Sequence, residues 1–453
     1  MSKVVVIGAG LAGSLLAIYL AKRGIAVDVF EARSDMRLHA VAAGRSINLA
    51  LSDRGIAALR EVGMDEYMLS EAIPMYGRMI HSYSGETKLL PYSGRKGEYI
   101  NSVSRTGLNV ALINEAEKYP GVQFVFNERC VDFHTSSGEV TFASGRTIRS
   151  DTVIATDGAG SAVREAMKRD VDGFQLSQVF LEHGYKELHI PPAGGESESR
   201  FLIEQNALHI WPRHQFMMIA LPNFDGSFTC TLFLANRSAG SSDVIGTEAL
   251  AFDRLGDAKS VIDFFNREFP DAISLMPSLV EDFFANPTGE LGTVKCWPWS
   301  IGGKALLLGD SAHAVVPFYG QGMNCAFEDI RVLDSLIDVH GEDWQKIYDE
   351  YGRLRKLNTD AIADMAEENF YEMRDATADP VFQRKRELET KLEQTYQDYF
   401  SKYSMVTFRE DLPYSVAKEK GNAQDRLLME ICRASGGPGQ IDLSQVIEEV
   451  RKL

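Results

Sequence analysis

Residues 3–31, KVVVIGAGLAGSLLAIYLAKRGIAVDVFE, decide the fold. An apolar run, a glycine-rich turn, a helical stretch and a second apolar run follow one another, which is the order of a strand–helix–strand unit. Gly8, Gly10 and Gly13 match GxGxxG, whose missing side chains permit a tight turn, close approach of a pyrophosphate and close helix–strand packing. Glu31 stands about 20 residues further on, where an acid can bind a ribose hydroxyl. The segment therefore predicts dinucleotide binding, without choosing between FAD and NAD.

Composition sets the broad class of the chain. It has 453 residues, 45% hydrophobic and 25% charged, an ordinary globular mix that can fill two or three domains. The formal charge of −17, without a basic tract, argues against nucleic acid or an anionic membrane surface as a partner. Five scattered cysteines without a CxxC pair favour reduced thiols and a cytoplasmic location. Without a signal-peptide pattern or a long apolar run, we expect neither export nor a membrane span.

Two later stretches extend the first motif. Residues 152–167, TVIATDGAGSAVREAM, combine an apolar strand ending at Asp157 with a helix that would carry Ser161 and Arg164. Taken alone, this stretch fits an ordinary turn before a capped helix equally well. Residues 304–313, KALLLGDSAH, form a buried strand that runs into Asp310, whose carboxylate could accept a hydrogen bond from a polyol chain.

GAGLAG, DGxxSxxR and GD, in this order and at these wide spacings, resemble the motifs of the para-hydroxybenzoate-hydroxylase type of flavin monooxygenase. The resemblance implies an α/β fold with a discontinuous Rossmann-like domain that binds FAD. The short alternating runs between the motifs predict a largely antiparallel substrate domain, and the helical spacing after residue 344 predicts a C-terminal part that caps the active site. The predicted divisions are 1–67, 101–177 and 291–343 for the FAD-binding domain, 68–100 and 178–290 for the substrate domain, and 344–453 for the helical C-terminal domain.

The stretch PFYGQGMN at 317–324 then has a function within this family. Its glycine backbone would lie against the isoalloxazine ring, because a β-carbon there would clash with the flavin. The N–H groups of Gly322, Met323 and Asn324, at the start of a helix, would stabilise the negative charge of a reduced flavin. Pro317, Phe318 and Tyr319 would be walls of the pocket, and no side chain is assigned a catalytic role. Alone, the stretch also fits a glycine-rich helix start with core aromatics.

Nine strings between residues 44 and 408 further resemble the kynurenine 3-monooxygenase family: GRSINLALSDRG, GRMIHS, HGYKEL, NALHIWPR, IALPN, SFTCTLFL, VPFYGQGMN, ENFYEM and YSMVTF. The resemblance implies that the substrate carboxylate binds Arg78 and Tyr92, helped by Asn369 and Tyr403. A guanidinium suits this role, because its planar fork matches a carboxylate and stays charged. It further implies an apolar pocket for the aromatic ring, formed by Leu208, Ile219, Leu221, Thr231, Phe233, Phe318 and Met373. It also implies FAD contacts from Arg45, Arg105 and Cys130.

The implied reaction is hydroxylation of L-kynurenine to 3-hydroxykynurenine with NADPH and O₂ through a flavin C4a-hydroperoxide. No metal is expected, since the nine histidines form no ligand set. A hydroxylase of another aromatic amino acid or an anthranilate-like acid stays open, as does a flavoprotein that reduces acceptors or binds ligands without oxygenating them. WPWSIG at 297–302 only half matches the WxWxIP string of flavin-dependent halogenases. The oligomeric state is left open, with a homodimer among the options.

Overall fold

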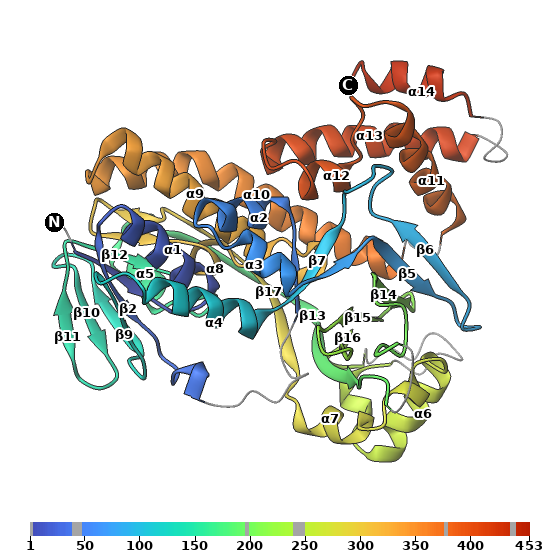
Figure 1. Cartoon of the computed structure of the whole chain (residues 1–453), viewed down its shortest axis with the longest axis horizontal. Helices are drawn as coiled ribbons and strands as arrows, with labels where there is room; N and C mark the ends of the chain where they lie inside the picture. Colours follow the sequence, from blue (N-terminus) through green and yellow to red (C-terminus); the bar gives the residue numbers. More distant parts are fainter. Residues whose placement is uncertain (1–2, 39–47, 195–198, 239–249, 376–378, 435–440) are drawn as a thin grey trace.

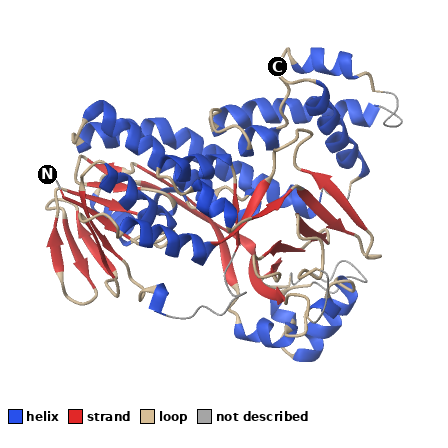
Figure 2. Cartoon of the chain, in the orientation of Figure 1, coloured by secondary structure: helices blue, strands red, loops and turns tan. Residues whose placement is uncertain are grey.

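The computed structural model describes residues 3–38, 48–194, 199–238, 250–375, 379–434 and 441–453. Two main sheets organise the chain, one built around the N-terminal strand and one from the middle of the sequence, and a group of helices follows towards the C-terminus (Figure 1). Colouring by secondary structure shows helices beside both sheets (Figure 2). The predicted mixed α/β class is confirmed.

The first sheet has six strands in the order β18-β19-β12-β1-β2-β8, all parallel except for the β18–β19 pair. Val4 to Ile7 in β1 are all buried, as expected for a strand packed on both faces. The glycine-rich turn leads from β1 into a helix, so the strand–helix–strand unit forms as predicted. The strands are β1 (Lys3–Ile7), β2 (Ala26–Phe30), β8 (Val122–Val125), β12 (Thr152–Ala155), β18 (Ser300–Ile301) and β19 (Ala305–Leu307).

Helices of this half pack closely around the turn. The first, α1 (Leu11–Lys22), packs against α4 (Arg105–Ala116) and α9 (Gly322–His340). Nearby lies a small sheet of β9 (Cys130–His134), β10 (Glu139–Phe142) and β11 (Thr147–Arg149). The remaining helices here are α2 (Asp53–Glu61), α3 (Asp65–Ser70), α5 (Ala162–Asp170) and α8 (Asp310–His313).

The second sheet has seven strands in the order β17-β13-β16-β15-β14-β5-β6. Its pairs are antiparallel except for β14 with β5, which run parallel. The strands are β5 (Gly77–His81), β6 (Thr87–Pro91), β13 (Gln175–Ile190), β14 (Ala207–Pro212), β15 (Met217–Pro222), β16 (Phe228–Ala235) and β17 (Gly289–Trp297).

The two faces of the second sheet serve different hydrophobic clusters, because successive side chains of a strand point to opposite faces. Met218, Cys230 and Leu232 belong to a core with α6 (Ala258–Glu268) and α7 (Leu279–Ala285). Side chains of the other face, such as Met217 and Phe233, join a cluster with the C-terminal helices. The sheet is therefore a wall between an ordinary core and the candidate active site.

The C-terminal quarter, from residue 344 onward, is helical in its described residues, as predicted. Its first helix is long and packs against α9 and α13. A separate short sheet has the strand order β3 (Asn48–Leu51), β7 (Ile100–Ser104), β4 (Ile73–Met75), and both of its pairs are antiparallel. The helices are α10 (Trp344–Asp375), α11 (Pro380–Thr395), α12 (Lys402–Thr407), α13 (Tyr414–Ala434) and α14 (Leu443–Val450).

Within the described ranges, no helix has the length and apolarity needed to cross a membrane. The division into FAD-binding, substrate and C-terminal domains stays a proposal. The strand memberships support it, since β1, β2, β8 and β12 share one sheet while β5, β6 and β13 to β16 share another. One strand, β17, joins the second sheet although most of it falls in the segment predicted for the first domain.

Candidate active site

Three sequence motifs meet at one edge of the first sheet. Strands β19, β12, β1 and β2 are parallel neighbours, so their carboxyl ends lie side by side. Asp310, Asp157, the turn from Gly8 to Gly13, and Glu31 follow these ends in the same order. Ligands of open α/β sheets bind at the carboxyl ends of the strands. The edge is therefore the candidate cofactor site.

The three glycines of the turn have different reasons to lack a side chain. A β-carbon on Gly8 would stand 2.6 Å from the Thr156 carbonyl oxygen, and one on Gly13 would stand 1.9 Å from the Gly8 carbonyl oxygen. A β-carbon on Gly10 would meet nothing within 4 Å. The fold itself requires glycine at Gly8 and Gly13, whereas the open space at Gly10 fits a ligand that lies against the backbone.

Glu31 and the start of α1 complete this part of the site. No side chain of the described residues caps α1, and the first turn of α1 carries no acid, so its free N–H groups suit an anionic phosphate. The Glu31 carboxylate accepts hydrogen bonds from the Ala9 N–H (2.8 Å) and from Arg33 (Nε, 2.7 Å). Burial alone would raise the pKa of Glu31, but the hydrogen bonds from Arg33 and Ala9 lower it. The carboxylate is therefore an ionised acceptor at the end of β2.

Asp157 and Asp310 keep acceptor atoms free. Oδ2 of Asp157 accepts the Ala162 N–H at 2.9 Å, while Oδ1 is buried and has no partner among the described residues. Cys130 lies close enough that Asp157 helps burial to raise the thiol pKa to about 12, so this thiol stays protonated. The Asp310 side chain is accessible to solvent. Desolvation by the protein around it raises its pKa, and the charges of nearby His313 and Arg105 oppose this rise. Both acids can thus receive hydroxyl donors from a ligand.

The start of α9 forms the other side of this region. The first helical bond of α9 runs from the Cys325 N–H to the Gln321 carbonyl (2.8 Å), which leaves the N–H groups of Gly322, Met323 and Asn324 without helical partners. The Asn324 side chain is used within the protein, since it accepts the Ser52 N–H at 3.0 Å and donates to the carbonyls of Ala50 and Gly320. Only the backbone N–H of Asn324 is therefore offered to a ligand.

Arg78 on β5 is buried, with 7% of its surface exposed, and with Tyr92 and Tyr403 it forms the candidate anion pocket. Its nearest counter-ion is Glu372, 3.6 Å from Nη1, and its Nε has no hydrogen-bond partner in the described part of the chain. The hydroxyl of buried Tyr92 likewise has none. The guanidinium lies 5.1 Å from the ring centre of Tyr403, which stacks on Tyr92 with 5.0 Å between centres. Two buried donor atoms that have no hydrogen-bond partner among the described residues are suited to a carboxylate.

Aromatic and amide groups close the pocket next to Arg78. Tyr319 stacks on Tyr403 at 5.6 Å between ring centres. Phe318 contacts Phe233 of β16 (4.9 Å) and Phe370 of α10 (4.5 Å). The Asn369 side chain donates to the Phe318 carbonyl at 2.6 Å and to the Met373 sulfur at 3.4 Å. In this conformation Asn369 fixes the wall residue Phe318, and its contact with a substrate stays a prediction. Pro317 is exposed at the rim.

The predicted lining residues of β14 to β16 all lie on the Arg78 face of the second sheet. Leu208 is the register partner of Arg78, and Ile219 pairs with Thr231. Leu221 and Phe233 are two residues further along the same strands and so point to the same side. Leu208, Ile219, Leu221 and Thr231 are half-buried rather than buried, as expected for positions that border a pocket.

Comparison with known proteins agrees with this geometry. A family model described as an FAD binding domain matches residues 1–242 and 290–366. A kynurenine 3-monooxygenase of Myxococcus xanthus is 45% identical, over 99% of this chain and 94% of the relative. The chain belongs to the kynurenine 3-monooxygenase family. A further member, from Dictyostelium discoideum, is 42% identical over 95% of this chain and 93% of its own length.

Solved structures confirm the fold of this kynurenine 3-monooxygenase family member. The tetrameric form of 2-methyl-3-hydroxypyridine-5-carboxylic acid oxygenase superposes with a TM-score of 0.65 at 20% identity, covering 90% of this chain and 96% of the oxygenase. PqsL of P. aeruginosa, solved in complex with 2-aminobenzoylacetate, gives 0.66 at 18% identity over 83% and 97%. At these identities the likeness is one of architecture only.

The predicted site residues described above form two groups, one at the strand ends of the first sheet and one around Arg78, and Arg45 lies outside the described residues. Their individual functions stay predictions. Two carboxylates near Arg78 and the lining residues were not predicted from the sequence of this family member. Glu372 lies beside Arg78, and Glu187 on β13 is the register partner of Thr231, where burial raises its pKa. Glu187 lies in the string HGYKEL that carried the resemblance, so the string was a usable signal for it.

Proposed function

We propose that this chain is an FAD-dependent monooxygenase that hydroxylates L-kynurenine to 3-hydroxykynurenine with NADPH and O₂. The observation that carries the substrate assignment is a pair of buried donors beside an apolar wall, Arg78 Nε and the Tyr92 hydroxyl, for which the described part of the chain offers no hydrogen-bond partner. The family relation supports the reaction, and the three motifs at the strand ends support FAD.

The anion pocket and the sheet face would hold the two ends of the substrate. Arg78 and Tyr92 would bind the carboxylate, and Glu372 offers an acceptor to the α-ammonium group. The aryl ring would lie on Ile219, Leu221 and the other side chains of the lining face. Because burial raises the pKa of Tyr92 well above 10, this hydroxyl keeps its proton and donates to the carboxylate.

The residues fit FAD, as the open space at Gly10, the free Oδ1 of Asp157 and the uncapped start of α9 indicate. Bound FAD supplies the activated oxygen, with electrons from NADPH. The side chains orient the ring carbon beside the aromatic amine, while Phe318 and Tyr319 keep water from it. The aromatic amine already enriches that carbon in electrons, so the proposal requires no basic side chain.

The proposal also covers location. All five cysteines carry free thiols and four of them are buried, which supports a reducing compartment such as the cytoplasm.

The test is NADPH oxidation by the purified, FAD-loaded protein with and without L-kynurenine, followed by mass analysis of the product. We expect strong stimulation and a product heavier by one oxygen. Stimulation with peroxide as the only product would reject kynurenine in favour of another aromatic amino acid or an anthranilate-like acid. If kynurenine leaves NADPH oxidation unchanged, the proposed substrate is wrong.

A further inference from the structure

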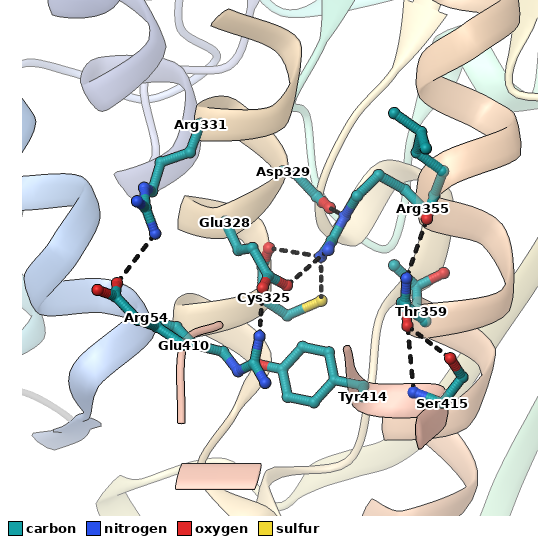
Figure 3. A network of polar contacts seen from close by, with 12 residues as sticks. Arg54, Cys325, Glu328, Asp329, Arg331, Arg355, Thr359, Glu410, Tyr414 and Ser415 are labelled. Carbon is teal, nitrogen blue, oxygen red and sulfur yellow. Dashed lines mark hydrogen bonds and ion pairs between the residues drawn. The ribbon is translucent and has the colours of Figure 1, made fainter. Parts of the chain in front are cut away.

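A buried ion network joins α9 to α2 and α10 (Figure 3). Arg54 of α2 and Arg355 of α10 both pair with Glu328, one with each carboxylate oxygen. Arg355 also donates to Asp329 through Nε at 2.7 Å. Arg54, Arg355 and Asp329 are each at most 3% exposed. Two cations and two anions balance within the network, which is the condition for keeping charges away from water.

This network leaves no place for a metal ion. His313, Cys325 and Asp329 offer ligand atoms within 4.8 Å of one another, a spacing that could hold one. The Arg355 guanidinium, however, already donates to Asp329 and lies 3.4 Å from the Cys325 sulfur. Although burial alone would raise the pKa of Asp329, His313 and Arg355 lower it to about 2. The positive charge that an ion would supply is already present, so the network holds helices together.

Arg54 has a second set of partners at the end of α12 and in the segment that follows it. Its guanidinium donates to the carbonyl oxygens of Val406 (3.2 Å), Arg409 (3.0 Å) and Leu412. It also lies 3.9 Å from the ring centre of Tyr414, at the start of α13. One buried side chain of α2 thus contacts the end of α12, the connection that follows it and the start of α13, and Figure 3 shows Arg54 beside Tyr414.

Tyr414 carries this link to the flavin-facing turn. Its hydroxyl donates to Oε1 of Gln321 at 2.9 Å, and Nε2 of Gln321 donates to the Ser52 hydroxyl at 3.2 Å. Burial raises the pKa of Tyr414 well above its usual value, so the hydroxyl is always a donor here. These bonds fix which way the amide of Gln321 points, directly before Gly322 and the free N–H groups of α9.

The helix that leads into this connection, α12, reaches the candidate anion pocket. Tyr403 belongs to α12 and stacks on both Tyr92 and Tyr319. We propose that Arg54 and Tyr414 are positioning residues. They hold Tyr403 and the turn at Gln321 at a fixed distance and orientation, so that a substrate bound at Arg78 is placed for hydroxylation at the flavin. The proposal rests on the proposed function.

The first test is Tyr414→Phe in the FAD-loaded enzyme. The ring over Arg54 is kept, while the Gln321 acceptor loses its donor in a buried place. We expect the fraction of consumed NADPH that appears as hydroxylated product to fall about fivefold, with the remainder released as peroxide and the KM for kynurenine nearly unchanged. Amide hydrogen exchange should become faster in residues 320–325. Tyr399→Phe is the matched control, because it removes a buried hydroxyl that has no hydrogen-bond partner among the described residues.

A second variant pair tests the link itself. Gln321→Met and the double variant with Tyr414→Phe complete a mutant cycle, and the double variant should lose no more product yield than Gln321→Met alone. Arg54→Lys, which keeps the charge without the fork, should accelerate exchange in residues 406–414. Product yield and exchange in Tyr414→Phe equal to those of Tyr399→Phe would overturn the proposal. If the unaltered enzyme makes no hydroxylated kynurenine, the proposed function fails instead, and the exchange comparison still decides the positioning role.

Discussion

Replacing Arg78 with Met is the sharpest test of the anion pocket. The side chain is 7% exposed, its Nε has no hydrogen-bond partner among the described residues, and a guanidinium fork can give a carboxylate two charge-assisted hydrogen bonds. Such bonds contribute about 1.5 to 2 kcal/mol each, together about 3 to 4 kcal/mol. At 1.4 kcal/mol for each factor of ten, kcat/KM for kynurenine should fall roughly 10²- to 10³-fold, chiefly through KM.

The assay is steady-state formation of hydroxylated product, with the bound-flavin spectrum as a check on the cofactor site. The spectrum should not change, because Arg78 belongs to the second sheet rather than to the strand-end site. The control substrate is the amine analogue of kynurenine that lacks the carboxylate. Its kcat/KM should be nearly the same for the unaltered enzyme and for Arg78→Met. Equal loss of activity towards kynurenine and this analogue would refute the assignment, since the defect would then not involve the carboxylate.

Three further predictions concern the cofactor turn and acid stability. Asp310→Ala should weaken FAD retention at least about tenfold, measured by flavin release on dilution, because the carboxylate is the free acceptor at the end of β19. Gly10→Ala should leave the melting temperature of the FAD-free protein unchanged yet weaken FAD binding at least about tenfold. Gly13→Ala should lower the melting temperature as well. Equal effects of the two variants would contradict the geometry of the turn. Burial lowers the pKa of His209 to about 4, so the unfolded chain takes up the extra proton between about pH 6.5 and 4. The free energy of unfolding, measured by urea titration, should be highest above about pH 6.5 and should fall by about 3 kcal/mol as the pH is lowered to about 4. His209→Gln should remove this pH dependence.

The cofactor edge could be predicted because its information is local. Each motif is a strand followed by a marked turn, and parallel pairing then places Gly8, Asp157 and Asp310 at one edge, although the first and last are about 300 residues apart. The lining of β14 to β16 could be predicted from the family resemblance, and the period-2 alternation of strands explains why those positions share one face.

The partners of the buried cations had no such local pattern. Nothing in the sequence around Arg78 indicates that Glu372 will lie 3.6 Å away, and nothing around Arg54 indicates three carbonyl acceptors beyond residue 405. These contacts depend on how the C-terminal helices dock, which is set by long-range packing. Asn324 differs in another way, since its side chain serves the turn and only its backbone faces the cofactor region.

Because the two faces of the second sheet serve different clusters, residues that line the substrate site can change without changing the residues that stabilise the fold. Exchanges confined to Leu208, Ile219, Leu221, Thr231 and Phe233 alter one face only, while the alternate positions keep α6 and α7 in place. Natural drift or laboratory selection can therefore explore new aromatic substrates in few steps, each with small loss of stability. Arg78 lies on a neighbouring strand and is untouched by these exchanges, so the descendants of such a search should still prefer substrates that carry a carboxylate.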